Sequence, residues 1–135
     1  MSQENVETFK RGLDAYHHRD VEAMLEDADA EIEWQPGVLT GLGGDAAVYR
    51  GHEGIREGFR DLFETMGEIR LEYPEIRDLG DCIVGIGCIH ARGTESRAEI
   101  ESPHATVVEY RNGLAIRVRS YFDPKEALEA AGLRE

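Results

Sequence analysis

Residues 98–122 read AEIESPHATVVEYRNGLAIRVRSYF, two strand-like runs separated by the pair Asn112 and Gly113. An Asn-Gly pair between alternating apolar residues is a strong signal for a tight β-hairpin turn. The stretch therefore predicts two antiparallel strands joined by that turn. We expect the neighbouring strands of the sheet to be arranged around this hairpin.

Two further strand-like runs precede the hairpin. Residues 69–79 alternate around Pro74, and residues 81–93 are apolar on both faces of the expected strand. Gly85 and Gly87 lie inside the second run, where glycine indicates a bend or a close approach by other atoms. Together with the hairpin, these runs predict a curved antiparallel meander.

The first half of the chain shows helical spacing. Apolar residues recur at helical intervals over residues 6–16 and 51–66, and Asp20 is a candidate N-cap of a short helix between them. A short alternating strand at 30–36 and a glycine-rich loop at 36–48 precede the third helix. This order predicts an α+β fold with helices on one face of the sheet. A curved sheet covered in this way leaves a cone-shaped space that can hold a ligand.

The chain closes on a short predicted helix. Asp123 directly precedes Pro124 and stands three residues before Glu126, an arrangement typical of a helix N-terminus. Asp123 is therefore interpreted as a helix cap rather than a catalytic acid.

The composition disfavours several classes of partner. The 135 residues fit a single domain, residues 1–135, and contain 15 Lys and Arg against 28 Asp and Glu, a net charge of −13. Such an acidic chain is unsuited to nucleic acid or to an anionic membrane surface, both of which attract clustered basic residues. No segment resembles a signal peptide or approaches the ~18 apolar residues of a transmembrane helix.

The cysteines predict a reduced protein. Cys82 and Cys88 lie in one expected strand, and at ~3.3 Å per residue they are about 20 Å apart, too far for a disulfide. We therefore expect a cytoplasmic location. The Cys and His spacings match no zinc motif, so no metal is expected.

Three segments carry a resemblance to a known family: VYRGHEGIREGF at 48–59, RNGLAIRVRSYFD at 111–123 and YFDPKEALEAAGL at 121–133. They resemble SnoaL-like proteins, the polyketide-cyclase and ketosteroid-isomerase-related members of the NTF2-like superfamily. The resemblance covers nearly the whole chain in the same order of elements. It implies a cone-shaped α+β barrel, with about three N-terminal helices, a curved antiparallel sheet and a short C-terminal helix.

The same resemblance implies an internal pocket, a homodimer, and no metal or organic cofactor. The activities that it suggests include ring closure, double-bond isomerisation and epoxide hydrolysis. Because one fold hosts many activities, each activity has to be tested on the residues that would carry it.

Ketosteroid isomerases use a base that removes a proton from the carbon beside a carbonyl group. Two hydrogen-bond donors, a tyrosine and a protonated acid, then hold the enolate oxygen. The resemblance places the tyrosine position at Gly12, the base at Trp34 or Gln35, and the strand acid at Thr106. A shift of one residue would recover Glu33 as the base, but not the other groups. The sequence therefore does not predict a standard ketosteroid isomerase.

Limonene-epoxide hydrolases use an Asp-Arg-Asp set. The resemblance places one of these aspartates three residues before Asp123, where this chain has Ser120. A serine cannot replace a carboxylate base, so a standard epoxide hydrolase is not predicted either.

His104 and Tyr16 are the candidate catalytic residues. His104 shares a strand face with Thr106, the face that the resemblance turns toward the pocket, and an ordinary histidine pKa suits acid or base chemistry. Tyr16 lies one helical turn after Gly12 and could donate a hydrogen bond to an enolate oxygen. Purely structural roles, with His104 at a strand end and Tyr16 in the core, stay open.

The predicted pocket wall also includes aromatic, aliphatic and hydroxyl side chains from the helices and late strands. They are Trp34, Phe59, Phe63, Thr106, Val108, Tyr110, Val118 and Ser120. His90 and Arg92 are expected at the pocket mouth or in a dimer interface, with the interface favoured.

Three functions fit these expectations. The first is a cofactor-independent cyclase or isomerase acting on a small, largely apolar carbonyl compound. The second is a non-catalytic protein that binds such a compound in the same pocket. The third is a dimeric interaction module, which predicts a filled cavity and an exposed apolar groove. Whether the chain is an enzyme stays open at this point.

Overall fold

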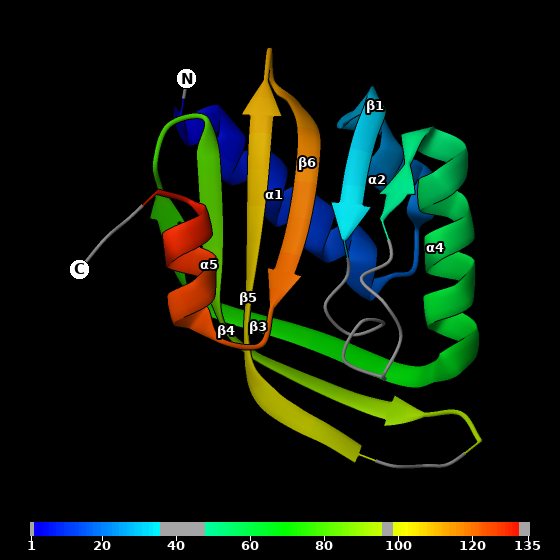
Figure 1. The fold of residues 1–135 in the computed structure, drawn as a ribbon. Coiled ribbons are helices and arrows are strands. Elements are labelled where there is room, and N and C mark those ends of the chain that lie inside the picture. Colours follow the sequence, from blue (N-terminus) through cyan, green and yellow to red (C-terminus); the bar gives the residue numbers. More distant parts are fainter. Residues whose placement is uncertain (1, 36–47, 96–98, 133–135) are drawn as a thin grey trace.

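The computed structural model describes residues 2–35, 48–95 and 99–132, shown as a ribbon in Figure 1. The glycine-rich loop predicted at 36–48 lies outside these described residues, except for Val48. The elements in chain order are α1 (Ser2–His17), α2 (Val21–Glu26), β1 (Ala28–Gln35), β2 (Tyr49–Arg50), α4 (Gly51–Thr65), β3 (Met66–Asp78), β4 (Cys82–Gly93), β5 (Glu99–Arg111), β6 (Leu114–Tyr121) and α5 (Pro124–Ala130).

The strands form a 6-stranded sheet in the order β2-β1-β6-β5-β4-β3. The predicted antiparallel meander from β3 to β6 is confirmed. One pairing differs from the expected wholly antiparallel sheet, because β1 lies parallel to β6 and the sheet is mixed. The reason is that α2 delivers the chain to the end of the sheet where β6 begins, so that Ala28 pairs with Ala115.

The hairpin between β5 and β6 has the predicted tight turn. Asn112 and Gly113 both adopt positive φ angles, 55° and 80°, as a two-residue type I′ turn requires. Arg111 and Leu114 pair directly on either side of the turn. The local sequence signal therefore sets the pairing next to the turn, and a register shift between Glu109 and Tyr110 follows before the strands reach Thr106 and Ser120.

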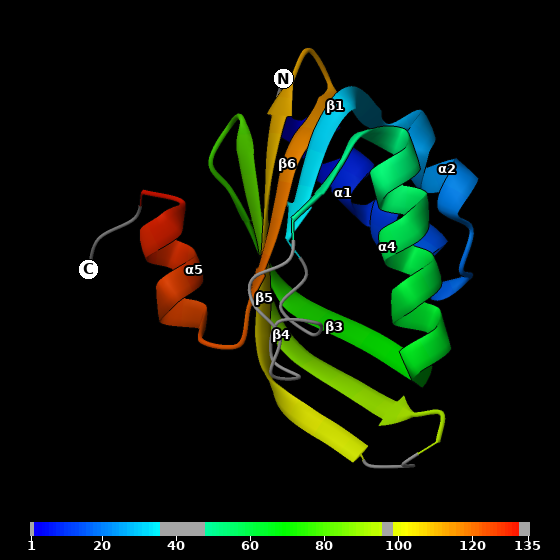
Figure 2. The ribbon, with the colours of Figure 1, turned by 45° about the vertical axis from the view of Figure 1, so that its right-hand side comes forward.

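The two glycines of β4 mark close approaches, as predicted. A Cβ atom on Gly87 would lie 1.8 Å from the backbone oxygen of Glu72, next to a register shift between Glu72 and Glu75. A Cβ atom on Gly85 would lie 2.7 Å from the ring of Phe9. The absence of both side chains lets residues of β3 and α1 pack closely against β4. The sheet is curved in this region (Figure 2).

Helices α1, α2 and α4 cover the concave face of the sheet, whereas α5 packs on the opposite face (Figure 2). Two short helices begin at the predicted caps: the Asp20 side chain accepts a hydrogen bond from the backbone N–H of Ala23, and Asp123 accepts one from that of Lys125. Within the described residues, no helix is long and apolar enough to cross a bilayer.

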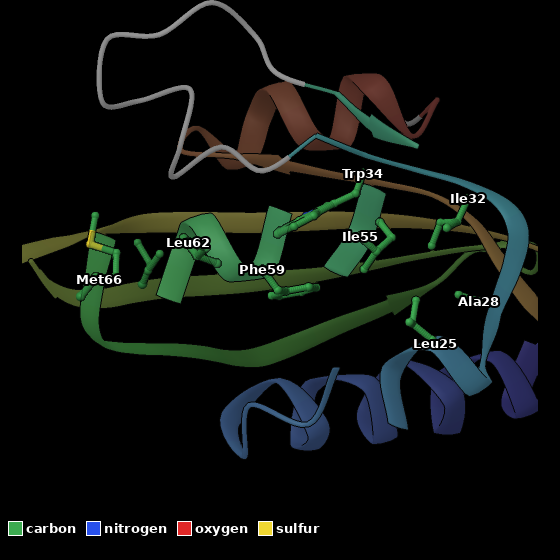
Figure 3. Packing of buried hydrophobic residues seen from close by; sticks show 10 residues of the cluster. Leu25, Ala28, Ile32, Trp34, Ile55, Phe59, Leu62 and Met66 are labelled. Carbon is green, nitrogen blue, oxygen red and sulfur yellow. The ribbon is translucent and has the colours of Figure 1, made fainter. Parts of the chain in front are cut away.

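The main apolar core lies between α4, β1 and the strands behind them (Figure 3). Leu62 is 1% exposed and Ile89 is fully buried, and burial of such a side chain contributes about 1.5–3 kcal/mol. The labelled members of this core in Figure 3 are Leu25, Ala28, Ile32, Trp34, Ile55, Phe59, Leu62 and Met66.

Candidate functional site

Helices α1, α2 and α4 and the concave face of the sheet bound a cavity of about 160 Å³. Its wall contains every residue predicted for the catalytic site and pocket except Phe63. These wall residues are Tyr16, Trp34, Phe59, His104, Thr106, Val108, Tyr110, Val118 and Ser120. Their functional roles remain predictions.

Aromatic rings build one side of the cavity. Trp34 from β1 stacks on Phe59 from α4, with ring centroids 4.2 Å apart and planes 18° apart. Tyr16 from α1 meets Phe59 edge-on at 5.7 Å. Stacked and edge-to-face pairs are favourable aromatic arrangements, so this wall is a firm apolar surface.

Phe63 lies outside the cavity wall. In a helix, each residue is rotated by about 100° from the one before it. Leu62 lines the cavity, and Phe63 is therefore turned toward α1, where it packs beside Tyr16 and beneath the Arg19 guanidinium, 4.6 Å from its ring centroid.

Polar side chains from β3, β5 and β6 form a connected chain at another part of the wall. The Tyr73 hydroxyl lies 2.7 Å from Nδ1 of His104 and 2.6 Å from Oγ1 of Thr106. Thr106 in turn lies 3.3 Å from Oγ of Ser120. His104 is 1% exposed, and its other ring nitrogen, Nε2, has no hydrogen-bond partner among the described residues.

Tyr73 reaches His104 because β4 has a glycine between them. Thr106 on β5 pairs with Gly85 on β4, and a Cβ atom on Gly85 would lie 2.8 Å from the Tyr73 ring. With no side chain there, the Tyr73 ring passes over β4 and contacts residues on β5. The close approach that Gly85 allows thus assembles the polar chain.

Burial decides the protonation states of these groups. It lowers the pKa of His104 to about 4, so the imidazole is neutral at neutral pH. It also raises the pKa of Tyr73 well above 10, so the phenol keeps its proton. When Tyr73 donates that proton to Nδ1, the single imidazole proton is on Nε2, the nitrogen without a partner.

Tyr16 does not join this polar chain. No hydrogen bond connects its hydroxyl with His104 within the described parts of the chain, and Tyr73 occupies the position of hydrogen-bonding partner. Burial raises the pKa of Tyr16 far above its ordinary value, so this hydroxyl also stays protonated. Its predicted role as an enolate donor remains a prediction.

A second polar group borders the cavity at Asp27, which forms an ion pair of 3.3 Å with Arg11. Burial, and then the nearby Asp27 carboxylate, raise the pKa of Tyr110. The Asp27 carboxylate is therefore paired with the Arg11 guanidinium, and the neighbouring Tyr110 phenol is uncharged.

The positions at which the resemblance would place catalytic groups also line the cavity. Gly12, Trp34, Thr106 and Ser120 are all in its wall. None of these four residues carries a carboxylate. The cavity therefore occupies the expected place but offers different chemistry.

Sequence reasoning missed Tyr73. Its signal was the alternation of residues 69–79, which turns Ile69, Leu71 and Tyr73 toward one face. The pattern alone does not place Tyr73 against His104, because the contact crosses an intervening strand.

A curved sheet with helices on its concave face and a cavity between them defines a cone-shaped α+β protein. The SnoaL-like domain matches residues 9–118, most of the chain, and the chain therefore belongs to the SnoaL-like domain family. No curated protein sequence matches the chain.

Solved structures of the same fold agree with this assignment. An NTF2-like protein of unknown function from Burkholderia pseudomallei K96243 is 21% identical over 93% of this chain and 95% of its own, with a TM-score of 0.79. TerC, co-crystallised with polyporic acid, is 23% identical over 96% and 99%, with a TM-score of 0.77. A protein with a ketosteroid isomerase-like fold from Catenulispora acidiphila DSM 44928, in complex with trimethylamine, is 14% identical over 95% and 94%, with a TM-score of 0.74. At these identities, the likeness concerns the fold.

Proposed function

We propose that the chain binds a small, largely apolar compound with a carbonyl or similar oxygen, and that His104 recognises that oxygen. The observation that carries the proposal is the buried, neutral His104 in the cavity wall, whose Nε2 has no partner in the described structure. An unpaired buried polar group costs about 1–3 kcal/mol. A ligand oxygen that accepts a hydrogen bond from Nε2 would offset this cost.

The cavity volume limits the size of the ligand. At about 160 Å³ it is close to the ~150 Å³ apolar cavity that holds benzene in another protein, and below the ~300 Å³ of most drug-sized sites. A compound with one ring, such as a cyclic ketone, therefore fits better than a steroid. The apolar walls made by Trp34, Phe59 and Val108 suit its hydrocarbon part.

His104 is better suited to donate a hydrogen bond than to act as a base. A base becomes an imidazolium when it takes a proton, and burial opposes this positive charge. No carboxylate contacts the His104 ring in the described residues to offset that cost. We therefore assign His104 the role of donor, in place of the base considered from the sequence.

A second candidate function is cofactor-independent isomerisation or ring closure of the same ligand. It is supported by two cavity-wall hydroxyls that burial keeps protonated, those of Tyr16 and Tyr110, and by the similarity of the fold to a putative SnoaL-like polyketide cyclase. Donors of this kind stabilise a developing enolate oxygen. NMR detects this activity as the exchange of ligand α-hydrogens for deuterium when the protein is present. If the α-hydrogens do not exchange, the function is limited to binding.

An interaction module has less support. That function predicts a filled cavity and an exposed apolar groove, whereas Val48 is the sole large apolar residue exposed among those described. The cavity and the small molecules in the structures of TerC and the Catenulispora protein favour a ligand instead.

Binding of matched ligand pairs tests the proposal. Calorimetry compares cyclohexenone and similar one-ring ketones with hydrocarbons of the same shape, for the wild type and for His104→Leu. Loss of one hydrogen bond of about 1.4 kcal/mol weakens ketone binding about tenfold, and hydrocarbon binding should not change. His18→Gln, at an exposed helix end, is the control. Equal ketone affinity in the wild type and His104→Leu would refute the role of His104.

A further inference from the structure

The face of the sheet opposite the cavity holds a cluster of polar side chains. In β4, Ile89 and Ala91 are buried in the core, so Cys88 and His90 point away from it. Cys88 pairs in register with Glu72 on β3.

On the other side of β4, His90 pairs with Glu101 on β5. Three neighbouring strands thus bring a thiol, an imidazole and two carboxylates together.

The potential ligand atoms are separated by distances close to those of a tetrahedral metal site. Sγ of Cys88 lies 3.2 Å from Nε2 of His90, and that nitrogen lies 3.2 Å from Oε1 of Glu72. Sγ lies 3.7 Å from the same carboxylate oxygen. With Zn–S of ~2.3 Å and Zn–N or Zn–O of ~2.1 Å, tetrahedral angles give separations of about 3.3–3.6 Å.

Neighbouring groups hold two of these ligands in position. Nδ1 of His90 lies 2.9 Å from a Glu101 oxygen, the carboxylate–histidine arrangement that commonly orients a metal-bound imidazole. Arg70 contacts the second oxygen of Glu72 at 3.2 Å, which leaves Oε1 facing Cys88 and His90.

We propose that Glu72, Cys88 and His90 bind a divalent zinc ion, with water at the fourth coordination position. Sulfur and nitrogen ligands favour zinc and related transition metals over magnesium or calcium, which prefer oxygen. In the single chain, the His90 side chain is 28% exposed, so an ion can reach the site from solvent. The site is separate from the cavity and does not depend on the function proposed for it.

The same surroundings argue against a reactive cysteine. Desolvation, and then the neighbouring Glu72 carboxylate, raise the pKa of Cys88, so the thiol keeps its proton at neutral pH. A bound cation displaces that proton because it stabilises the thiolate.

Linear motifs do not reveal this site. Cys88 and His90 are separated by one residue, which in a strand places them on the same face, and the third ligand comes from another strand. The Cys and His spacings therefore predicted no metal, and it is the strand register that brings the three ligands together.

Cobalt binding to the reduced, metal-free chain of 135 residues tests the proposal. We expect one Co²⁺ per chain, with a thiolate-to-cobalt band in the near ultraviolet that excess Zn²⁺ abolishes. Cys88→Ser removes the band and weakens zinc binding at least about tenfold. Cys82→Ser is the matched control, because Cys82 packs against the apolar group under α5 and should keep the wild-type spectrum and affinity.

Glu101→Gln separates positioning from ligation. It should keep the cobalt–thiolate band but weaken zinc affinity about 10–100-fold, the usual cost of removing an orienting carboxylate. Cobalt binding without a thiolate band, or equal zinc affinity in Cys88→Ser and Cys82→Ser, would overturn the proposal.

Discussion

Acid should destabilise this protein through His104 in a predictable range of pH. The folded-state pKa of His104 is about 4, below the ordinary value of 6.5 for an unfolded histidine. The folded state therefore favours the neutral imidazole, and the unfolded state binds more protons between these two values. Stability from this residue is fully present above pH 6.5 and is lost as the pH falls toward 4.

The size of the effect follows from the two pKa values. At ~1.4 kcal/mol per pKa unit, the difference between 6.5 and about 4 makes the folded state about 3 kcal/mol less stable at pH 4 than at pH 7. The chain also contains 28 Asp and Glu residues, a side-chain class that gains protons in the same acid range. A variant without the imidazole is therefore needed to isolate the contribution of His104.

Urea denaturation of the wild type and of His104→Leu at pH 7 and pH 4 measures this contribution. His104→Leu should lose about 3 kcal/mol less than the wild type between the two pH values, because the other titrating groups are common to both proteins. NMR titration of the His104 ring gives its pKa directly. Equal acid losses in the two proteins, or a His104 pKa near 6.5, would refute the reasoning.

Three other predictions depend on the packing, and a fourth depends on the family resemblance. Gly85→Ala places a Cβ atom 2.7 Å from the Phe9 ring, so urea denaturation should show a loss of about 1–3 kcal/mol, and NMR a changed His104 pKa. Leu62→Ala should cost about 2–5 kcal/mol by the same assay and allow calorimetry to detect two-ring ketones, because Leu62 is buried in the cavity wall. Asp123→Ala should lower stability in thermal denaturation by about 1 kcal/mol and leave ketone binding unchanged. Light scattering should give twice the mass of one chain, since the family resemblance implies a homodimer.

Matched controls make these predictions specific. Gly12→Ala adds a Cβ atom with nothing within 4 Å in a helix, so it should not destabilise, and equal losses for Gly12→Ala and Gly85→Ala would contradict the packing argument. Retention of one-ring selectivity in Leu62→Ala would show that this residue does not limit the cavity. Weakened ketone binding in Asp123→Ala would contradict its assignment as a cap, and the mass of a single chain would exclude the dimer.

Local signals predicted most of the fold. The Asn112–Gly113 turn, the caps at Asp20 and Asp123, and the periodicity of the helices each depend on residues close in sequence. The parallel pairing of β1 with β6 was not predictable in this way. It depends on where α2 returns the chain, which no local pattern records.

The same distinction between local and long-range signals applies to the candidate site. Strand alternation put His104, Thr106 and Val108 on one face, because two-residue periodicity is a local property, and the family resemblance turned that face toward the cavity. The contact of Tyr73 with His104 crosses a third strand and requires both the register and the space above Gly85. The same limit applies to the proposed zinc ligands, which belong to different strands.

The most direct test of the account is NMR of the His104 ring nitrogens as a one-ring ketone is added. We predict that Nε2 carries the imidazole proton and that its resonance shifts with the ketone, whereas the matched hydrocarbon leaves it unchanged. Binding of the ketone with no change at Nε2, or a proton on Nδ1 in the complex, would contradict the central claim that His104 recognises the ligand oxygen.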